Sequence, residues 1–406
     1  MRILLQAPPG FGKSRRLAKI AVEHGGTALF FVRSHMEAFQ IYSYIASYGG
    51  TASLMFGRSA LCRFGAKTAA ECSALREKGV CKVRYKYINK KFAKIEEIYD
   101  FGVCPYEYLQ ALGRQSKIAV LPLSYLESQE YLSSIADMLR EAELVVVDEA
   151  HNLLLHDLAV EKDAPSGRLC DESLRRCLLL PIVGRLLDGR DVVLASASIT
   201  KPFSDIFIEL LNMRYINKDN IFFDNLIIDI YPIEIRYKNR MKRYIVDMIR
   251  EIIITIFKSN SKIIVFVPNK DIFEYYKRRL KDLPLSDRPL GDLPHIVLTY
   301  FGSPLAEGLN IDVDAAVLVG FPLPNIKDPW LKSKMRLIGE LGYSGFKYVL
   351  LFGAVSNSIQ AMGRAMRDLE KKEKYIVAVD DRFWRYRWAM PRWFYSSATL
   401  RETPKR

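Results

Sequence analysis

Eight consecutive residues near the start of the chain have types and spacing suited to holding phosphate. They read APPGFGKS at positions 7–14, between an apolar strand-like segment and a helix-like segment. Glycines at 10 and 12 allow backbone N–H groups to close around phosphate oxygens, and a helix start adds partial positive charge. We expect Lys13 to reach the terminal phosphates of a nucleotide and Ser14 to hold Mg²⁺. The expected nucleotide-binding residues are Ala7, Pro8, Pro9, Gly10, Phe11, Gly12, Lys13 and Ser14, together with Gln360 far along the chain.

A second set of chemically capable residues follows the apolar run LVVV at 144–147. Asp148 and Glu149 end this predicted strand, where neighbouring side chains point to opposite faces and can take different roles. We expect Asp148 to hold the Mg²⁺ shell and Glu149 to orient and deprotonate an attacking water. His151 would couple this site to a second domain. Phosphoryl transfer requires little more than such positioning and charge neutralisation.

A third set lies in SIQAMGRAMRDLEKK at 358–372, whose pattern predicts one long helix. Three- and four-residue steps place Gln360, Gly363, Arg364 and Arg367 on one face of that helix. The two arginines could act on charge that develops on a terminal phosphate. A solvated basic face is the alternative, and the phosphate-binding motif favours the catalytic interpretation.

Composition narrows the class of protein. The 406 residues include 60 Lys+Arg and 46 Asp+Glu, a net charge of +14, and half are apolar. This balance excludes a disordered chain, and no apolar run approaches the ~18–20 residues of a membrane span. The phosphate-binding motif begins too early for a signal peptide, so we expect an intracellular, cytoplasmic protein. The positive charge predicts an anionic partner such as nucleic acid, and a basic isoelectric point without functional meaning is the alternative.

The six cysteines are unevenly placed. Four of them lie within 43 residues, whereas Cys170 and Cys177 stand apart at helical spacing. A reducing interior argues against disulfides, so the clustered thiols suggest a metal or iron–sulfur site, with unrelated buried thiols as the alternative. The clustered cysteines are Cys62, Cys72, Cys81 and Cys104.

Strand-like and helix-like segments alternate along most of the chain, which predicts parallel sheets covered by helices. The pattern breaks at about 58–103, a basic stretch that looks like an insertion. We therefore expect an α/β fold with three parts. A first domain spans 1–57 and 105–200, a cysteine-bearing insertion spans 58–104, and a second domain spans 201–406. The aromatic-rich run 384–395 should form a final helix that packs on the second domain.

The insertion interleaves basic and aromatic residues, as a groove for single-stranded nucleic acid would require. The run comprises Arg84, Tyr85, Lys86, Tyr87, Lys90, Lys91 and Phe92. A small domain with an ordinary basic face is the alternative interpretation.

The motifs APPGFGKS, VVVDEAHN, LASASIT, GSPLAEGLNID and QAMGRAMR, in this order, resemble those of superfamily 2 helicases. VCPYEYLQALGRQSKIAVLPLSYL at 103–126 is especially similar to the XPD/DinG branch, which carries an iron–sulfur cluster. The resemblance covers nearly the whole chain and implies two RecA-like motor domains. It also implies that Arg33 and His35, within FFVRSHMEAFQ, contact the nucleic-acid backbone.

The resemblance implies that the four clustered cysteines ligate a 4Fe–4S cluster, for which four thiolates are the usual complement. The gaps of 9, 8 and 22 residues are wider between the second and third cysteine than in the family. Zinc would also accept four thiolates, but the CxxC spacing typical of zinc sites is absent.

Two departures from the family pattern have functional consequences. Relatives carry an upstream segment that contacts adenine, so base recognition here should be built differently. Relatives also insert a helical Arch domain where this chain has only 47 residues between His151 and Ile199. We therefore expect a more open channel for the strand.

These features predict an ATP-dependent enzyme, a 5′→3′ DNA helicase that uses ATP, Mg²⁺ and a 4Fe–4S cluster. Its partners would be single-stranded DNA or forked duplex DNA and repair proteins, with no membrane. One alternative is a single-strand-stimulated ATPase or translocase that does not unwind duplexes. Another is a non-catalytic metal-binding nucleic-acid module with a degenerate ATP site.

Overall fold

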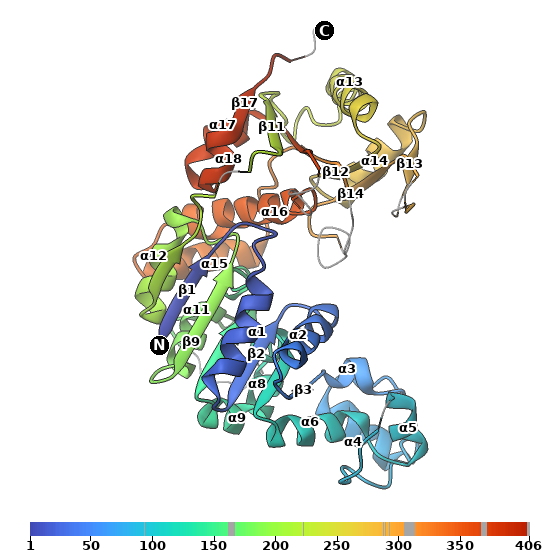
Figure 1. Ribbon diagram of the computed structural model, residues 1–406, viewed down its shortest axis with the longest axis vertical. Helices are drawn as coiled ribbons and strands as arrows, with labels where there is room; N and C mark the ends of the chain where they lie inside the picture. Colours follow the sequence, from blue (N-terminus) through green and yellow to red (C-terminus); the bar gives the residue numbers. More distant parts are fainter. Residues whose placement is uncertain are drawn as a thin grey trace. The chain divides into compact units, whose positions relative to one another are not determined.

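The fold is that of a computed structural model of the chain (Figure 1). It describes residues 1–92, 94–160, 167–221, 223–286, 288, 290–291, 293–303, 313–366 and 372–403. The chain divides into two compact units. One consists of residues 1–4, 13–195 and 210–214, and the other consists of residues 5–12, 196–209 and 215–406. The domain boundaries expected at 57/58, 104/105 and 200/201 stay predictions.

A seven-stranded sheet dominates the first half of the chain. Its strands, in spatial order, are β10 (Arg214–Asn217), β1 (Arg2–Gln6), β9 (Asp191–Ser196), β5 (Leu144–Val147), β2 (Ala28–Val32), β4 (Ile118–Pro122) and β3 (Ala52–Leu54). The pairs β9–β5, β5–β2, β2–β4 and β4–β3 are parallel. Every residue of β2, β4 and β5 is buried, as expected for parallel strands covered on both faces.

Twelve helices follow or connect these strands in the described residues. They are α1 (Lys13–His24), α2 (His35–Ser47), α3 (Arg58–Leu61), α4 (Ala69–Glu77), α5 (Ile95–Asp100), α6 (Pro105–Gln115), α7 (Ser124–Glu127), α8 (Gln129–Ser134), α9 (Ala136–Glu141), α10 (Asn152–Leu155), α11 (Leu179–Leu186) and α12 (Lys201–Leu211). Helices α3 to α6 gather beside the end of β3 (Figure 1), and the clustered cysteines lie in α4 and in the segments next to these helices. They surround a small core of Ile98, Val103 and Tyr108.

A second seven-stranded sheet is parallel between all its neighbours. Its order is β13 (Leu285–Ser286), β14 (His295–Tyr300), β12 (Lys262–Val267), β15 (Ala315–Val319), β16 (Lys374–Val379), β11 (Leu226–Tyr231) and β17 (Ala398–Leu400). The helical segments are α13 (Arg243–Ser259), α14 (Lys270–Arg279), α15 (Pro329–Glu340), a π-helix (Phe346–Leu351), α16 (Phe352–Met362), α17 (Asp381–Arg385), a 3₁₀ turn (Arg387–Ala389) and α18 (Arg392–Ser397). The α/β class and the two parallel sheets predicted from the sequence are therefore confirmed.

The isoleucine stripe of α13 shows how this core is specified by the sequence. Buried residues recur at three- and four-residue steps from Ile245 through Ile249 and Ile252 to Ile256. This is the period of an amphipathic helix, so one face of α13 packs against the sheet and the other stays polar.

The expectation that Cys170 and Cys177 lie at helical spacing is wrong. They sit on β7 (Cys170–Asp171) and β8 (Arg176–Leu178), which pair antiparallel with the two cysteines opposite each other. These strands form a three-stranded sheet with β6 (Asp157–Ala159). The two cysteines form a disulfide, which the expected reducing interior had argued against. The short sequence separation fits a hairpin as well as a helix, so spacing alone did not distinguish them.

Two further expectations about helices are also wrong. The helix predicted through 358–372 ends at Met362, with Gly363 as its C-terminal cap. The aromatic run 384–395 forms three short helical pieces rather than one final helix, because Pro391 starts a new segment. Trp393 and Phe394 are buried as expected, whereas Trp388 is exposed.

Candidate functional site

The predicted phosphate-binding loop connects β1 directly to α1. Gly10 and Gly12 adopt φ angles of 77° and 75°, in the left-handed region that glycine enters without strain. The Phe11 N–H donates a hydrogen bond to the Pro8 carbonyl oxygen at 3.4 Å. Helix α1 begins at Lys13 as expected. The loop is therefore a tight turn into a helix N-terminus, the geometry in which backbone N–H groups bind phosphate.

Residues 363–366 pack against this loop, and both segments lie in the same compact unit. A Cβ on Gly10 would lie 2.9 Å from the Met366 carbonyl oxygen, and one on Gly363 would lie 3.1 Å from Pro9 Cβ. Only glycine allows backbones to approach so closely. Both glycines therefore let the segment that carries Arg364 lie next to the loop.

The structure describes two of the other expected site residues in and beside this segment, Gln360 and Arg364, and does not describe Arg367. Gln360 lies near the end of α16 and is half-buried, and Arg364 is buried in the turn after the helix. Arg367 lies outside the described residues, as does most of the motif GSPLAEGLNID.

Lys13 and Ser14 begin α1, and their charged partner Asp148 directly follows β5. Burial lowers the pKa of Lys13, whereas the charges of Glu149 and Asp148 raise it. The pKa of Asp148 rises to about 6 because of burial and the neighbouring Glu149, and a hydrogen bond from Ser14 and the charge of Lys13 oppose this rise. The structure thus brings together the ammonium, hydroxyl and carboxylates expected around a nucleotide's phosphates and metal ion.

Glu149 occupies a strained backbone position in this site. Its φ is +50°, where a non-glycine residue costs roughly 1–2 kcal/mol. Strand β5 ends at Val147, so this turn rather than strand alternation sets the direction of the two carboxylates. The Glu149 N–H donates to Asp148 Oδ1 at 2.9 Å. Strain of this kind is typical of functional sites.

His151 contacts the same carboxylate from the following turn. Its Nδ1 lies 3.2 Å from Glu149 Oε2, and the side chain is almost entirely buried. Burial lowers the pKa of His151, although Glu149 opposes this effect. At neutral pH, His151 therefore acts as a neutral partner that orients Glu149.

Sequence reasoning missed Glu37, which belongs to the same electrostatic cluster. Burial raises its pKa to about 7, and the charges of Glu149 and Asp148 contribute to this rise. Glu37 accepts hydrogen bonds from the backbone N–H groups of Arg33 and Ser34 at 3.0 and 3.3 Å. The pattern Ser-x-x-Glu at 34–37 is a capping-box signature that marks the start of α2. That signature predicted a helix cap and gave no sign of a nearby site.

The residues expected to contact nucleic acid lie at two places in the first unit. Arg33 and His35 connect β2 to α2, and the His35 ring lies 4.5 Å from the ring of Phe56. Arg33 also acts electrostatically on His151 of the carboxylate site. Arg84 and Tyr85 are exposed in the insertion. These positions leave Arg84 and Tyr85 accessible to a ligand.

Two aromatic residues of the insertion serve its own packing instead. The rings of Tyr87 and Phe92 lie 5.6 and 5.3 Å from the ring of Tyr108. Lys90 lies above the Phe101 ring at 4.2 Å. The basic–aromatic pattern therefore splits, since some of its aromatics form a small core while its cations remain at the surface.

The four clustered cysteines are free thiols and half-buried. Cys62 and Cys104 both act electrostatically on Tyr99, and Cys72 acts on Cys104. Within the described part of the chain, however, no three His, Cys, Asp or Glu side chains form a group that could hold a metal ion. The four thiols have the chemistry that a metal centre requires.

No helix of the described residues is long and apolar enough to cross a membrane.

Two segments of the chain match known protein families. Residues 270–397 match the helicase C-terminal domain, and residues 54–162 match DEAD_2. The ATP-dependent DNA helicase XPD of Sulfolobus acidocaldarius is 28% identical over 163 residues. This alignment covers 37% of the present chain and 29% of that helicase.

Solved structures share the fold. An XPD helicase structure superposes with a TM-score of 0.73 at 17% identity, covering 99% of this chain and 96% of that chain. Xpd4 of S. tokodaii gives a TM-score of 0.61 at 14% identity, covering 98% and 96%. The two parallel sheets are thus those of RecA-like domains. The chain thus contains one segment that matches DEAD_2 and one that matches the helicase C-terminal domain.

Proposed function

We propose that the chain is an ATP-dependent DNA helicase that couples ATP hydrolysis to 5′→3′ movement along single-stranded DNA. The observation that carries this proposal is the buried group of Lys13, Ser14, Asp148 and Glu149 in a chain with two helicase domains. This group holds a cation for terminal phosphates, a metal-binding hydroxyl and two carboxylates with distinct partners.

The residues fit a bound Mg²⁺. The hydroxyl of Ser14 and the carboxylate of Asp148 are hydrogen-bonded, and burial together with the charge of Glu149 raises the cost of ionising Asp148. Hard oxygen ligands and relief of this repulsion both suit Mg²⁺, which usually keeps several waters and uses few protein ligands. When bound, Mg²⁺ would neutralise charge that develops on the terminal phosphates.

The chain's own groups would divide the remaining work. The backbone N–H groups of Gly10, Phe11 and Gly12 would bind the phosphates, and Lys13 would neutralise their charge. Glu149, oriented by His151, accepts the proton of the attacking water. Arg364 supplies positive charge beside the loop. Arg367 and Gln360 complete the expected nucleotide contacts.

An assay with Glu149→Gln tests this assignment. Amide replacement keeps the shape and removes the base, so ATP hydrolysis should fall by roughly 10²–10⁴-fold while a labelled ATP analogue still binds. Glu23→Gln on the exposed face of α1 is the matched control and should hydrolyse ATP normally. Unimpaired turnover by Glu149→Gln would remove Glu149 from the mechanism.

From the resemblance to the XPD/DinG branch, we also propose that a 4Fe–4S cluster is held by Cys62, Cys72, Cys81 and Cys104. Four free thiols within one insertion support it. Protein purified without air should contain iron and acid-labile sulfide and be brown. A colourless preparation that contains zinc would assign the thiols to zinc instead.

A translocase that does not open duplexes is a second candidate. Between His151 and Ile199, the described residues form helix α10, the three-stranded sheet β6–β8–β7, helix α11 and strand β9, with no separate helical domain among them. Duplexes with a 5′ or a 3′ single-stranded tail separate the candidates. Opening of only the 5′-tailed duplex supports the helicase, and tail-stimulated hydrolysis with neither duplex opened supports the translocase.

Roles in DNA repair, with repair proteins as partners and a cytoplasmic location, complete the proposal. The XPD relative is a DNA helicase, and this supports DNA rather than RNA as the substrate.

A further inference from the structure

A strongly basic and aromatic loop follows β11 in the second unit. Residues 232–244, which we call the β11 loop, contain five basic side chains and one acidic side chain, Glu234. Tyr237 is 86% exposed, and Met241 and Tyr244 are exposed as well. Exposed aromatic side chains among cations require an explanation, because packing does not hold them at the surface. The basic residues are Arg236, Lys238, Arg240, Lys242 and Arg243.

Hydrogen bonds hold the backbone of this loop in one shape. The buried Asn239 accepts from the Arg236 N–H at 2.7 Å and donates to the Glu234 carbonyl at 2.8 Å. From α14, the hydroxyl groups of Tyr275 and Tyr276 donate to the carbonyls of Met241 and Arg240 at 2.6 and 3.0 Å. The loop is therefore preorganised, which lowers the entropy lost on binding a ligand.

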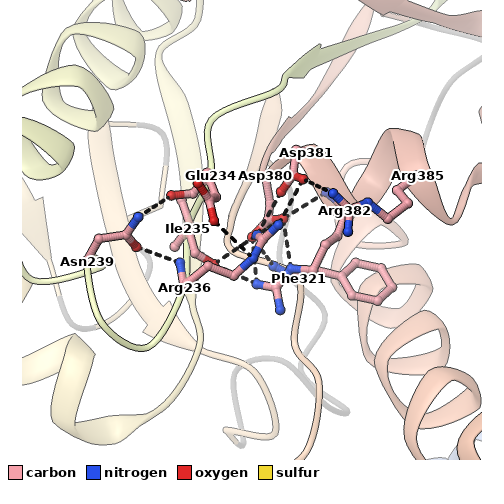
Figure 2. Close-up of polar contacts among 9 residues, drawn as sticks. All are labelled: Glu234, Ile235, Arg236, Asn239, Phe321, Asp380, Asp381, Arg382 and Arg385. Atoms are coloured by element: carbon pink, nitrogen blue, oxygen red, sulfur yellow. Dashed lines mark hydrogen bonds and ion pairs between the residues drawn. The ribbon is translucent and has the colours of Figure 1, made fainter.

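Arg236 anchors the loop to two neighbouring strands. Its guanidinium lies 2.7 Å from Asp381 Oδ1 and 3.4 Å from Asp380 Oδ1 (Figure 2). The fully buried Asp380 also accepts a hydrogen bond from the Phe321 N–H at 3.1 Å. Because Asp380 follows β16 and Phe321 follows β15, the carboxyl ends of three adjacent parallel strands are tied together. That edge is where open α/β sheets bind ligands.

The other basic side chains of the β11 loop lie at or near the surface. The Arg240 guanidinium lies 4.8 Å from the centre of the Tyr237 ring, so this ring already stacks with a cation. Lys238, Lys242 and Arg243 are exposed, and Arg243 opens α13. Besides Asp380 and Asp381, the acidic side chains Glu234 and Asp247 lie next to arginines of the loop: Glu234 next to Arg236 at 3.7 Å, and Asp247 next to Arg243 at 3.8 Å.

We propose that the β11 loop is a contact site for single-stranded nucleic acid, with Tyr237 stacking on a base and Lys238 and Lys242 binding backbone phosphates. A π-face among cations is how proteins bind single strands without reading sequence. An acidic peptide would use the charges but would not use the exposed face of the Tyr237 ring. The choice of nucleic acid rests on the proposed function.

Fluorescence anisotropy of a labelled oligothymidylate with the nucleotide-free full chain tests this site. Tyr237→Ala should raise Kd roughly tenfold, the size of one lost stacking contact. The double variant Lys238→Ala/Lys242→Ala should weaken binding and reduce the slope of log Kd against log salt by about 1.4, or about 0.7 for each phosphate.

Two matched variants separate this site from general surface charge. Tyr395→Ala removes another exposed aromatic, on α18, and Lys258→Ala removes a cation at the far end of α13. Both should bind the oligonucleotide as the unaltered protein does. Thermal unfolding of all variants confirms that they fold alike. Equal Kd values for Tyr237→Ala and Tyr395→Ala would overturn the proposal, as would a salt slope unaffected by the double variant.

The result also distinguishes this site from the proposed function. Loop-dependent binding by a protein that hydrolyses no ATP would keep the site and remove the motor. Stimulated ATP hydrolysis with loop-independent binding would keep the motor and remove the site. Loop-dependent binding that is stronger for duplex than for single strands would overturn the single-strand assignment.

Discussion

The molecule contains two clusters of buried charged side chains. Like charges lie together in one cluster, whereas opposite charges are paired in the other. In the first unit, the carboxylates of Asp148, Glu149 and Glu37 interact with one another, and Lys13 is the cation among them. In the second, Asp380 and Asp381 are surrounded by the guanidinium groups of Arg236, Arg382 and Arg385 (Figure 2).

The direction of the pKa changes shows the consequence. Mutual repulsion adds to burial in raising the pKa of Asp148 to about 6 and that of Glu37 to about 7. Burial also raises the pKa of Asp380, but Arg382 opposes it. Burial of Asp381 is outweighed by hydrogen bonding to Arg236, which holds its pKa below the ordinary value. The first cluster keeps negative charge available for a cationic ligand, whereas the second compensates its own charge and builds structure.

The backbone conformations of the two clusters differ as well. Glu149 is held at a positive φ, whereas Asp380 is extended. Strain thus accompanies the cluster that we assign to chemistry, and relaxed geometry accompanies the cluster that fastens strand ends.

The largest expected effect comes from removing Lys13 from the first cluster. Lys13→Ala should lower ATP hydrolysis by roughly 10³-fold, because phosphoryl transfer depends on neutralising phosphate charge. Oligonucleotide binding should change little, since Lys13 is a nucleotide contact. Steady-state phosphate release measures the first effect and anisotropy the second. Lys19→Ala, exposed on the same helix, is the control. Retained turnover would refute the phosphate-loop assignment.

In the second cluster, neutralising a carboxylate should destabilise the fold. Asp380→Asn leaves Arg236 and Arg382 partly buried without their shared counter-charge, which costs about 3 kcal/mol of unfolding free energy. Urea unfolding measures this loss. Asp282→Asn removes an exposed partner of Arg250 and should cause no measurable change. A stable Asp380→Asn variant would show that charge compensation is not what holds these strand ends together.

In the first cluster, neutralising a carboxylate should instead stabilise the fold. The pKa of Glu37 is raised from its ordinary 4.5 to about 7, so the folded protein binds more protons in this window and stability falls as pH rises through it. Glu37→Gln keeps the helix cap and removes this cost, which should stabilise the nucleotide-free protein by about 2 kcal/mol near pH 8 and much less near pH 5.

Thermal unfolding at both pH values, without Mg²⁺, measures this difference. Glu23→Gln on the exposed face of α1 should give a pH-independent result close to zero. If Glu37→Gln destabilises the protein at both pH values, the repulsion among the three carboxylates is not the dominant cost.

Local sequence predicted most of what lies within single segments. The loop from Ala7 to Gly12, the start of α1 at Lys13 and strand β5 ending before Asp148 agree with the structure within a residue or two. Such features depend on short-range physics, namely glycine turns, apolar runs and the period of the hydrophobic pattern.

Expectations failed where a neighbour in space decided the outcome. The helix through Arg364 ends early at a glycine that packs on Pro9, a contact invisible in the local pattern. Cys170 and Cys177 face each other across a hairpin, although their separation also suits a helix. Tyr87 and Phe92 turn inward because Tyr108, far along the chain, offers them a core.

The sequence by itself determined the α/β class, the phosphate loop and the identities of the paired carboxylates, because each is encoded in consecutive residues. Only the tertiary structure decided that Glu37 joins those carboxylates and that Arg236 is fastened by Asp380 and Asp381, leaving Tyr237 exposed. Burial and electrostatic coupling act over distance in space. Residues remote in sequence acquire a shared charge environment only when parallel strands bring their ends to one edge.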